Sequence, residues 1–201
     1  MNLEQLVGQI RAIHNQLAQQ ATKAVNLGLT LRNWLIGCHI QKYELRGEDR
    51  SEYGERLFEV LADRLTRQGL PNCNRRQLYR YRDFYQLYPQ IAGTLSPQFQ
   101  RMLPTLLPDE KVGTPSPQST VPSLPAEQIV ESLSYSHFEL LAAIDDPLKR
   151  AFYEIECVHG AWAVRELKRQ IASLYYERSG LSRDKKKLAA MVHAKAGHAT
   201  P

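Results

Sequence analysis

Six arginines lie between positions 64 and 82 of this sequence, with no acidic residue among them. They are Arg64, Arg67, Arg75, Arg76, Arg80 and Arg82. The turn-forming sequence Gly69–Asn72 separates the first two from the other four. A guanidinium group can donate paired hydrogen bonds to phosphate oxygens or to O6 and N7 of guanine. The composition and spacing of this segment therefore predict a surface that binds nucleic acid.

A second basic segment lies between positions 165 and 187, where eight lysines and arginines accompany three acidic residues. The whole chain has a net charge of +5, so the residues outside the two segments are net negative. Charge concentrated in this way indicates a polyanionic partner; the alternative is that these cations cover solvated helix faces. The predicted nucleic-acid contacts are Arg64, Arg67, Asn74, Arg75, Arg76, Gln77, Tyr79, Arg80, Arg82, Arg165, Lys168, Arg169, Lys185, Lys186 and Lys187.

Three other groups of residues could bind a metal or do acid–base chemistry, but each has a structural interpretation that we favour. Glu166–Lys168 has the Glu-x-Lys spacing of some nucleases, yet it lies in a helical pattern with no acid on a preceding strand. Asp145–Asp146 before Pro147 is typical of a helix N-cap. His137 and Glu139 have no third ligand nearby in sequence, so we expect His137 to make a hydrogen bond within its turn. We expect no cofactor, metal or small-molecule substrate.

A long N-terminal helix is predicted because no proline interrupts residues 2–46 and apolar or small residues recur every seven positions. One row of these positions contains Leu3, Ile10, Leu17, Ala24, Leu31 and Cys38. The row predicts packing against another helix, either of this chain or of a second copy in a homodimer. His14 lies on the same seam, where we expect a hydrogen-bonded core histidine. The segment is either one long helix or two collinear helices with a weak point near residues 26–28.

The central arginines lie in a predicted helix-turn-helix-like pair of helices. Apolar residues at helical spacing from Leu57 to Leu65 indicate the first helix. The second begins at a cap residue, Asn72 or Asn74, and runs to about Tyr88. On this second helix Leu78, Tyr81, Phe84, Tyr85 and Tyr88 share one arc, which predicts a core face. The arginines lie on the opposite side, and Tyr79 is the aromatic residue that points with them.

Composition predicts how the rest of the chain is organised. Residues 1–95 form an N-terminal helical part, and residues 96–127 form a flexible loop because they hold seven of the eleven prolines. Residues 128–182 form C-terminal helices that pack on the first part, the last of them over about Trp162–Arg178 with Leu174 on its buried arc. Residues 183–201 form a basic, disordered tail. No strand pattern is present, so the predicted class is all-α.

Composition also bears on location. The three cysteines are scattered and odd in number, which argues against a disulfide framework. The sequence has no apolar run of about 18 residues and no signal-peptide pattern. We therefore expect a cytoplasmic protein that does not enter membranes.

Several motifs, taken in order, resemble one bacterial family, the N-terminal domain of YhcG-type proteins. The stretches that carry the resemblance are Asn26, Trp34–Gly37, Arg50–Gly54, Gly69, Asn74–Tyr85, Leu133–Phe138, Arg150–Tyr153, Trp162–Ile171, Tyr175, Glu177, Arg178, Leu181, Asp184 and Lys185. Together they cover about residues 5–187, with the proline-rich insert as the variable part.

The resemblance implies a DNA-binding, helix-turn-helix-like module. In the family this domain precedes a PD-(D/E)XK nuclease domain, whose residues are absent from this sequence, so we expect no catalysis by this chain. The alternative function is a helical oligomerisation or protein-interaction module that uses the heptad seam of residues 3–38.

Overall fold

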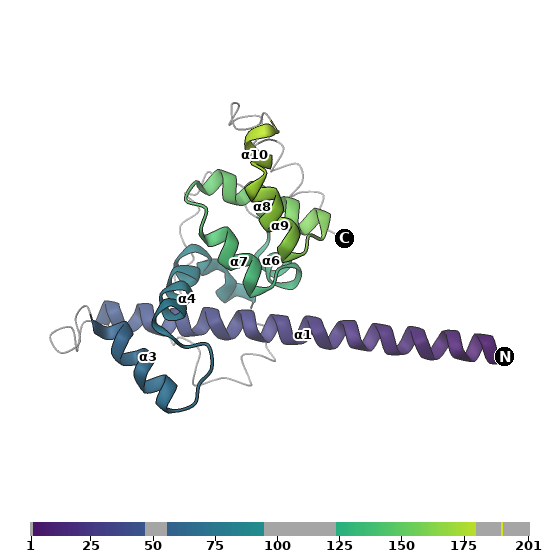
Figure 1. The fold of residues 1–201 in the computed structure, drawn as a ribbon, viewed down its shortest axis with the longest axis horizontal. Helices are drawn as coiled ribbons and strands as arrows, with labels where there is room; N and C mark the ends of the chain where they lie inside the picture. Colours follow the sequence, from purple (N-terminus) through teal and green to yellow (C-terminus); the bar gives the residue numbers. More distant parts are fainter. Residues whose placement is uncertain (1, 47–55, 95–123, 180–189, 191–201) are drawn as a thin grey trace.

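The computed structural model describes residues 2–46, 56–94, 124–179 and 190 (Figure 1). Every regular element in these ranges is a helix, which confirms the all-α class. In chain order they are α1 (Leu3–Arg46), α3 (Leu57–Arg67), α4 (Arg75–Leu87), the 3-10 helix η2 (Pro89–Thr94), α6 (Ala126–Ser132), α7 (Tyr135–Ala142), α8 (Pro147–Gly160), α9 (Val164–Ala172) and α10 (Tyr175–Arg178). Most of the predicted loop at 96–127 and almost all of the predicted tail at 183–201 lie outside the described residues.

Helix α1 is continuous, which confirms the first of the two alternatives, one long helix, so residues 26–28 do not divide it. Its start is set by a reciprocal cap, in which the Gln5 N–H donates to Asn2 Oδ1 at 2.8 Å and the Asn2 N–H donates to Gln5 Oε1 at 3.0 Å. It ends at Arg46, and Gly47, a residue type common just after a helix, follows in the sequence. None of the described helices is both long and apolar enough to cross a bilayer.

The remaining helices pack around the C-terminal half of α1. In Figure 1, α4 crosses α1, α6 to α10 lie on one side of it and α3 lies on the other. The main core contains the fully buried Trp34 of α1, whose Nε1 donates to the Tyr88 backbone oxygen at 2.9 Å. The Tyr88 hydroxyl in turn donates to Glu154 Oε1 of α8 at 2.6 Å. A single hydrogen-bonded path therefore joins α1, the end of α4 and α8.

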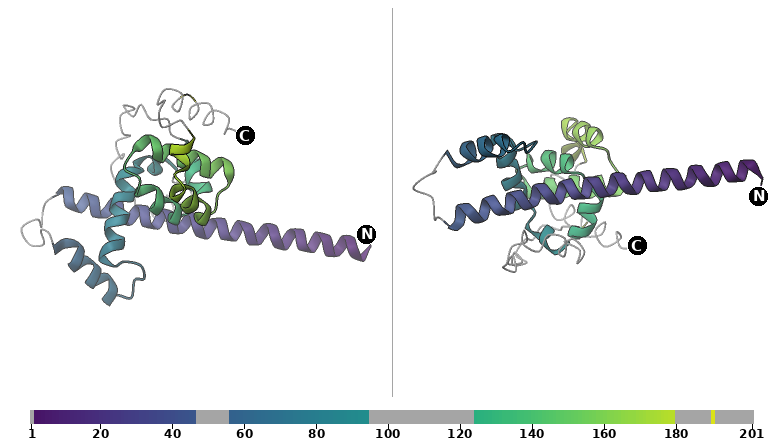
Figure 2. Two further views of the ribbon diagram at one scale, coloured as in Figure 1. Left: turned by 45° about the horizontal axis from the view of Figure 1, so that its top comes forward. Right: turned by 90° about the horizontal axis from the view of Figure 1, so that it is seen from below.

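The N-terminal part of α1 projects away from this body (Figures 1 and 2). Every residue from position 2 to position 26 is exposed. His14 is one of them, so its prediction as a core residue is wrong. The reason is tertiary: the described residues that cover the seam of α1 reach only its second half.

The last predicted helix is also corrected. The structure divides it into α9 and α10 at Leu174, which has the left-handed φ of 55° and is exposed rather than buried. The break lets the Tyr176 ring pack 5.4 Å from that of Phe152. It also lets the Tyr176 N–H donate to the Tyr153 hydroxyl at 3.3 Å. An unbroken helix would not point the Tyr176 side chain in this direction, so packing overrides the helical pattern.

Candidate nucleic-acid interface

The connection between α3 and α4 is an ordered turn that spans residues 68–74. Gly69 and Asn72 adopt left-handed conformations with φ values of 76° and 58°, which glycine and asparagine tolerate best. Asn74, one of the two predicted caps, then caps α4, because its side chain accepts a hydrogen bond of 3.0 Å from the Gln77 N–H. This turn is longer than the connection of about 3–4 residues in a standard helix-turn-helix motif.

Two side chains from outside the turn hold it in place. The Tyr81 hydroxyl donates to the Asn72 backbone oxygen at 2.8 Å. Arg32 of α1 donates through Nη2 to the Pro71 backbone oxygen at 3.1 Å. The same nitrogen lies 3.4 Å from the sulfur of the buried Cys73. The position of the basic residues around the turn is therefore set by α1 as well as by α4.

Four of the predicted arginines are exposed around this turn. Arg64 and Arg67 lie in the last turn of α3, and Arg75 and Arg76 lie in the first turn of α4. Their positions near the two ends of one connection give a local surface of positive charge, which we call the turn cluster. Cations arranged in this way can contact successive phosphates.

Arg80 and Arg82 are held by acidic residues of their own molecule. Arg80 Nη1 lies 3.0 Å from Glu139 Oε1 of α7. Arg82 Nη1 lies 3.3 Å from Glu44 Oε1 of α1, and its Nη2 lies 3.0 Å from Asp83 Oδ1. These ion pairs join α4 to α7 and to α1. Both arginines were predicted to contact nucleic acid, and in the structure each of them has an acidic partner within the chain.

Tyr79 is likewise engaged within the protein. Its ring stacks on that of Phe58 of α3, with centroids 3.8 Å apart and planes 11° apart. The guanidinium carbons of Arg82 and Arg75 lie 5.1 Å and 5.9 Å from the Tyr79 centroid. Tyr79 does point with arginines, as expected, but Phe58 already stacks on it, so it is not an open platform for a base.

Helix α4 is a core element along most of its length. Leu78, Tyr81 and Phe84 are buried, which confirms the predicted arc. Gly37 of α1 packs so closely that a Cβ atom there would collide with the Tyr81 carbonyl oxygen. The Asn74 side chain is engaged as the cap, where it accepts from the Gln77 backbone N–H, and the Gln77 side chain is half-buried. The first turn of α4 therefore offers Arg75 and Arg76 to a ligand, whereas the middle of the helix does not.

The second predicted basic segment is only partly described. Arg165, Lys168 and Arg169 are exposed on α9, around a shallow hollow of about 610 Å³. Arg169 Nη2 lies 2.7 Å from Glu166 Oε1, which offsets part of the charge. Lys185, Lys186 and Lys187 lie outside the described residues. In Figure 1, α9 and α3 lie on opposite sides of α1, so the fold does not merge the two basic segments into one patch.

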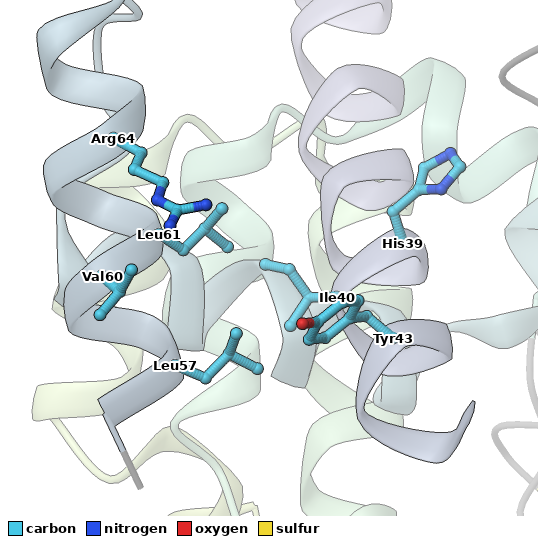
Figure 3. A pocket seen from close by; sticks show the side chains of 7 residues that line it. All are labelled: His39, Ile40, Tyr43, Leu57, Val60, Leu61 and Arg64. Atoms are coloured by element: carbon cyan, nitrogen blue, oxygen red, sulfur yellow. The ribbon is translucent and has the colours of Figure 1, made fainter. Parts of the chain in front are cut away.

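An apolar groove borders the turn cluster (Figure 3). It measures about 310 Å³ and lies between the C-terminal end of α1 and α3. The lining residues are His39, Ile40, Tyr43, Leu57, Val60, Leu61 and Arg64. Figure 3 shows Arg64 and Leu61 of α3 directed toward the α1 side of the groove. Its walls are mostly hydrocarbon, with polar groups from His39, Tyr43 and Arg64 alone, so the groove itself offers few donors to a phosphate.

The residues considered for metal binding or catalysis have structural roles. Both His137 nitrogens are engaged: Nδ1 accepts from the Ser134 N–H at 3.1 Å, and Nε2 lies 2.9 Å from the Trp162 backbone oxygen. This confirms the predicted hydrogen bond within the turn. Asp146 caps α8, as predicted, by accepting from the Leu148 N–H at 2.9 Å. No cluster of three possible metal ligands occurs within residues 2–46, 56–94 and 124–179.

Comparison with known sequences agrees with the order of these motifs along the chain. The pattern of the DUF1016 N-terminal domain matches residues 9–104 and 121–178. The chain belongs to the DUF1016 family. Its sequence is also 32% identical over 179 residues to "Putative nuclease YhcG" of Escherichia coli (strain K12). That match covers 83% of the chain and 44% of the relative, so the DUF1016 chain spans less than half of the relative's length. No solved structure matches it.

Three residues important to this DUF1016 domain were missed by sequence analysis. Arg32 supports the turn, and Glu44 and Glu139 hold Arg82 and Arg80. Arg32 lies 39 residues before Pro71, the residue that it contacts. Helical periodicity relates residues three or four positions apart and carries no signal for pairs this distant.

Proposed function

We propose that this chain is the DNA-binding N-terminal module of a YhcG-type nuclease, and that it contacts DNA through the turn cluster. The observation that supports this most directly is the placement of Arg64, Arg67, Arg75 and Arg76, exposed at the two ends of one ordered turn. The name of the curated relative supports the association with a nuclease. Catalysis then belongs to a domain that follows this one, and the module's task is to position DNA.

The turn cluster acts mainly on the phosphate backbone in this proposal. Arg75 and Arg76 lie at the N-terminal end of α4, where the helix dipole adds positive potential. The rest of α4 is packed against α1, so it does not enter the major groove along its length. We therefore expect strong dependence on salt and weak dependence on base sequence. Arg165 and Lys168 of α9 make a smaller contribution, because Glu166 offsets the charge of that segment.

A salt titration of duplex binding tests the proposal. The double variant Arg75→Ala/Arg76→Ala should reduce the slope of log K against log salt by about 2, because two phosphate contacts are removed. The matched control is Arg11→Ala/Lys23→Ala, which removes two exposed cations from the N-terminal part of α1 and should leave the slope unchanged. Equal losses in both variants would show that only net charge matters, and an unchanged slope in the first would exclude the turn cluster.

The exposed part of α1 favours a second function, oligomerisation, because its apolar side chains are exposed to solvent.

A further inference from the structure

The exposed N-terminal part of α1, residues 2–26, is a surface that a second helix would fit; we call it the arm. Its apolar side chains face solvent, with Leu3 at 72%, Ile10 at 57% and Leu17 at 58% of full exposure. Charged residues are few along its length: Glu4, Arg11 and Lys23. A helix that stays solvated carries a polar surface, and designed surfaces are about 25–35% charged. The arm therefore has the composition of a covered helix.

The apolar residues of the arm repeat as in a two-stranded coiled coil. Leu3, Ile10 and Leu17 occupy one heptad position, with Ala24 following them. Leu6 and Ile13 occupy the position three residues later, where Gln20 and Leu27 continue the row. This gives four heptads, the length at which such a repeat indicates pairing with another helix.

We propose that the arm pairs with the arm of a second copy of this chain, and that the two arms run antiparallel. A second copy is the simplest partner because its row of apolar heptad positions has the same length and composition. Self-pairing brings apolar positions together without burying a charged residue, since the heptad positions that face the partner hold Gln20 as their one strongly polar member.

The relative direction of the two arms follows from which part of the apolar face of α1 the body covers. Leu31 and Leu35 lie 18 residues, or five helical turns, after Ile13 and Leu17, so the two pairs share one face of α1. Ile13 and Leu17 are exposed, whereas Leu31 and Leu35 are buried at 3% and 7% exposure by the chain's own body. A partner helix that follows this face must therefore end before residue 30.

An antiparallel arm meets this condition and a parallel arm does not. In a parallel pair, the second copy would continue through its own residues 30–46 into space that the body already fills. In an antiparallel pair, the second copy arrives there with its helix start, which the Asn2–Gln5 cap places at Leu3. Leu3 then lies near Leu27 of the second copy and Leu6 near Ala24 of the second copy. The two bodies are held at opposite ends of the paired arms.

Mass measurement tests the pairing. By chromatography with light scattering, the full chain should have twice the 23.0 kDa mass of one chain. Ile10→Glu/Leu17→Glu should halve that mass without changing the helical signal, since neither side chain touches the body. Val25→Glu is the matched control, because Val25 is 61% exposed but does not belong to the two apolar heptad rows. A monomeric parent chain would overturn the proposal, including the case in which another segment of the same chain covers the arm. A double variant that stays dimeric would also overturn it.

Disulfide trapping tests the direction. Mixing Leu6→Cys with Ala24→Cys chains under oxidising conditions should give a covalent heterodimer in the antiparallel pair. Each single variant alone should give little disulfide-linked dimer, because identical positions near the ends of antiparallel arms lie far apart. Self-linked Leu6→Cys dimers without the mixed species would indicate parallel arms and overturn the assignment. The native Cys38, Cys73 and Cys157 are buried and free, so they do not compete for the introduced thiols.

Discussion

The two halves of α1 carry the same seven-residue repeat but have different surroundings. In the second half, Leu31 and Cys38 are buried beneath α4 and the C-terminal helices. In the first half, Ile10 and Leu17 occupy equivalent positions and remain more than half exposed. A heptad repeat therefore predicts that a helix will be covered, and does not say whether the cover is the same chain or another one.

The two halves also differ in their small residues. Gly37 allows α1 and α4 to approach until the Tyr81 carbonyl fills the space of a missing Cβ. Gly8 and Gly28 have no described residue within 4 Å of the position that a Cβ would take. Packing therefore requires Gly37, whereas Gly8 and Gly28 lower the helix propensity of α1 without permitting a close approach of any described helix.

The largest expected difference concerns core burial. Trp34→Ala should lower the free energy of unfolding by about 3–5 kcal/mol, because it leaves a cavity and removes the Nε1 hydrogen bond to Tyr88. Leu17→Ala, diluted until the chain is monomeric, should change it by less than about 0.5 kcal/mol. Urea denaturation followed by circular dichroism measures both. Equal losses would mean that a segment of the same chain covers the arm.

The free energy of unfolding should depend on pH, because Glu154 of α8 is buried. Burial raises the pKa of Glu154 to about 7, partly offset by the Tyr88 hydroxyl and by Arg150. The folded chain then binds this proton more tightly than the unfolded chain, in which the pKa is near 4.5. The free energy of unfolding should fall by about 3 kcal/mol as the pH rises from about 4.5 to 7, and stay level above that.

Glu154→Gln should abolish this fall, because an amide can accept from Tyr88 and does not titrate. Denaturant midpoints between pH 4.5 and 8 measure the effect, with the exposed Glu131→Gln as the control. A slope that persists in Glu154→Gln would assign the proton uptake to another group.

Alanine at two glycines of the same helix should act in opposite directions. Gly37→Ala should destabilise the chain by about 1–3 kcal/mol, since α4 must move away from α1. Gly8→Ala should favour the helical arm by up to about 1 kcal/mol, because alanine is the better helix former. Thermal unfolding ranks the two variants against the parent chain. If Gly37→Ala were neutral, the close crossing of α1 and α4 would be wrong.

The smallest expected effect is a difference in stability between variants of two kinds of arginine, those with ion pairs inside the protein and those of the turn cluster. Arg82→Ala should cost about 1 kcal/mol, because it removes the ion pairs with Glu44 and Asp83 at a half-buried site. Arg76→Ala should leave stability within about 0.5 kcal/mol of the parent chain while it weakens DNA binding. Comparing denaturation with DNA titration for each variant tests this division. Loss of DNA binding by Arg82→Ala without loss of stability would contradict it.

Much of the fold could be predicted from short stretches of sequence. The Asn74 cap, the Asp146 cap and the aromatic face of α4 are confirmed. Each depends on residues within one or two helical turns of one another, where capping and periodicity act. The break at Leu174 was not predictable in this way, because it depends on Tyr176 packing against α8.

For the candidate interface, local sequence was sufficient to establish an all-α chain and a basic turn between two helices. Packing was needed to show which of those cations a ligand can reach. Glu139 and Glu44 lie 59 and 38 residues from Arg80 and Arg82, and only the folding of α7 and α1 onto α4 brings these charges together. A side chain's position along a helix can be derived from its neighbours in sequence, but its partner in space is set by how distant helices meet.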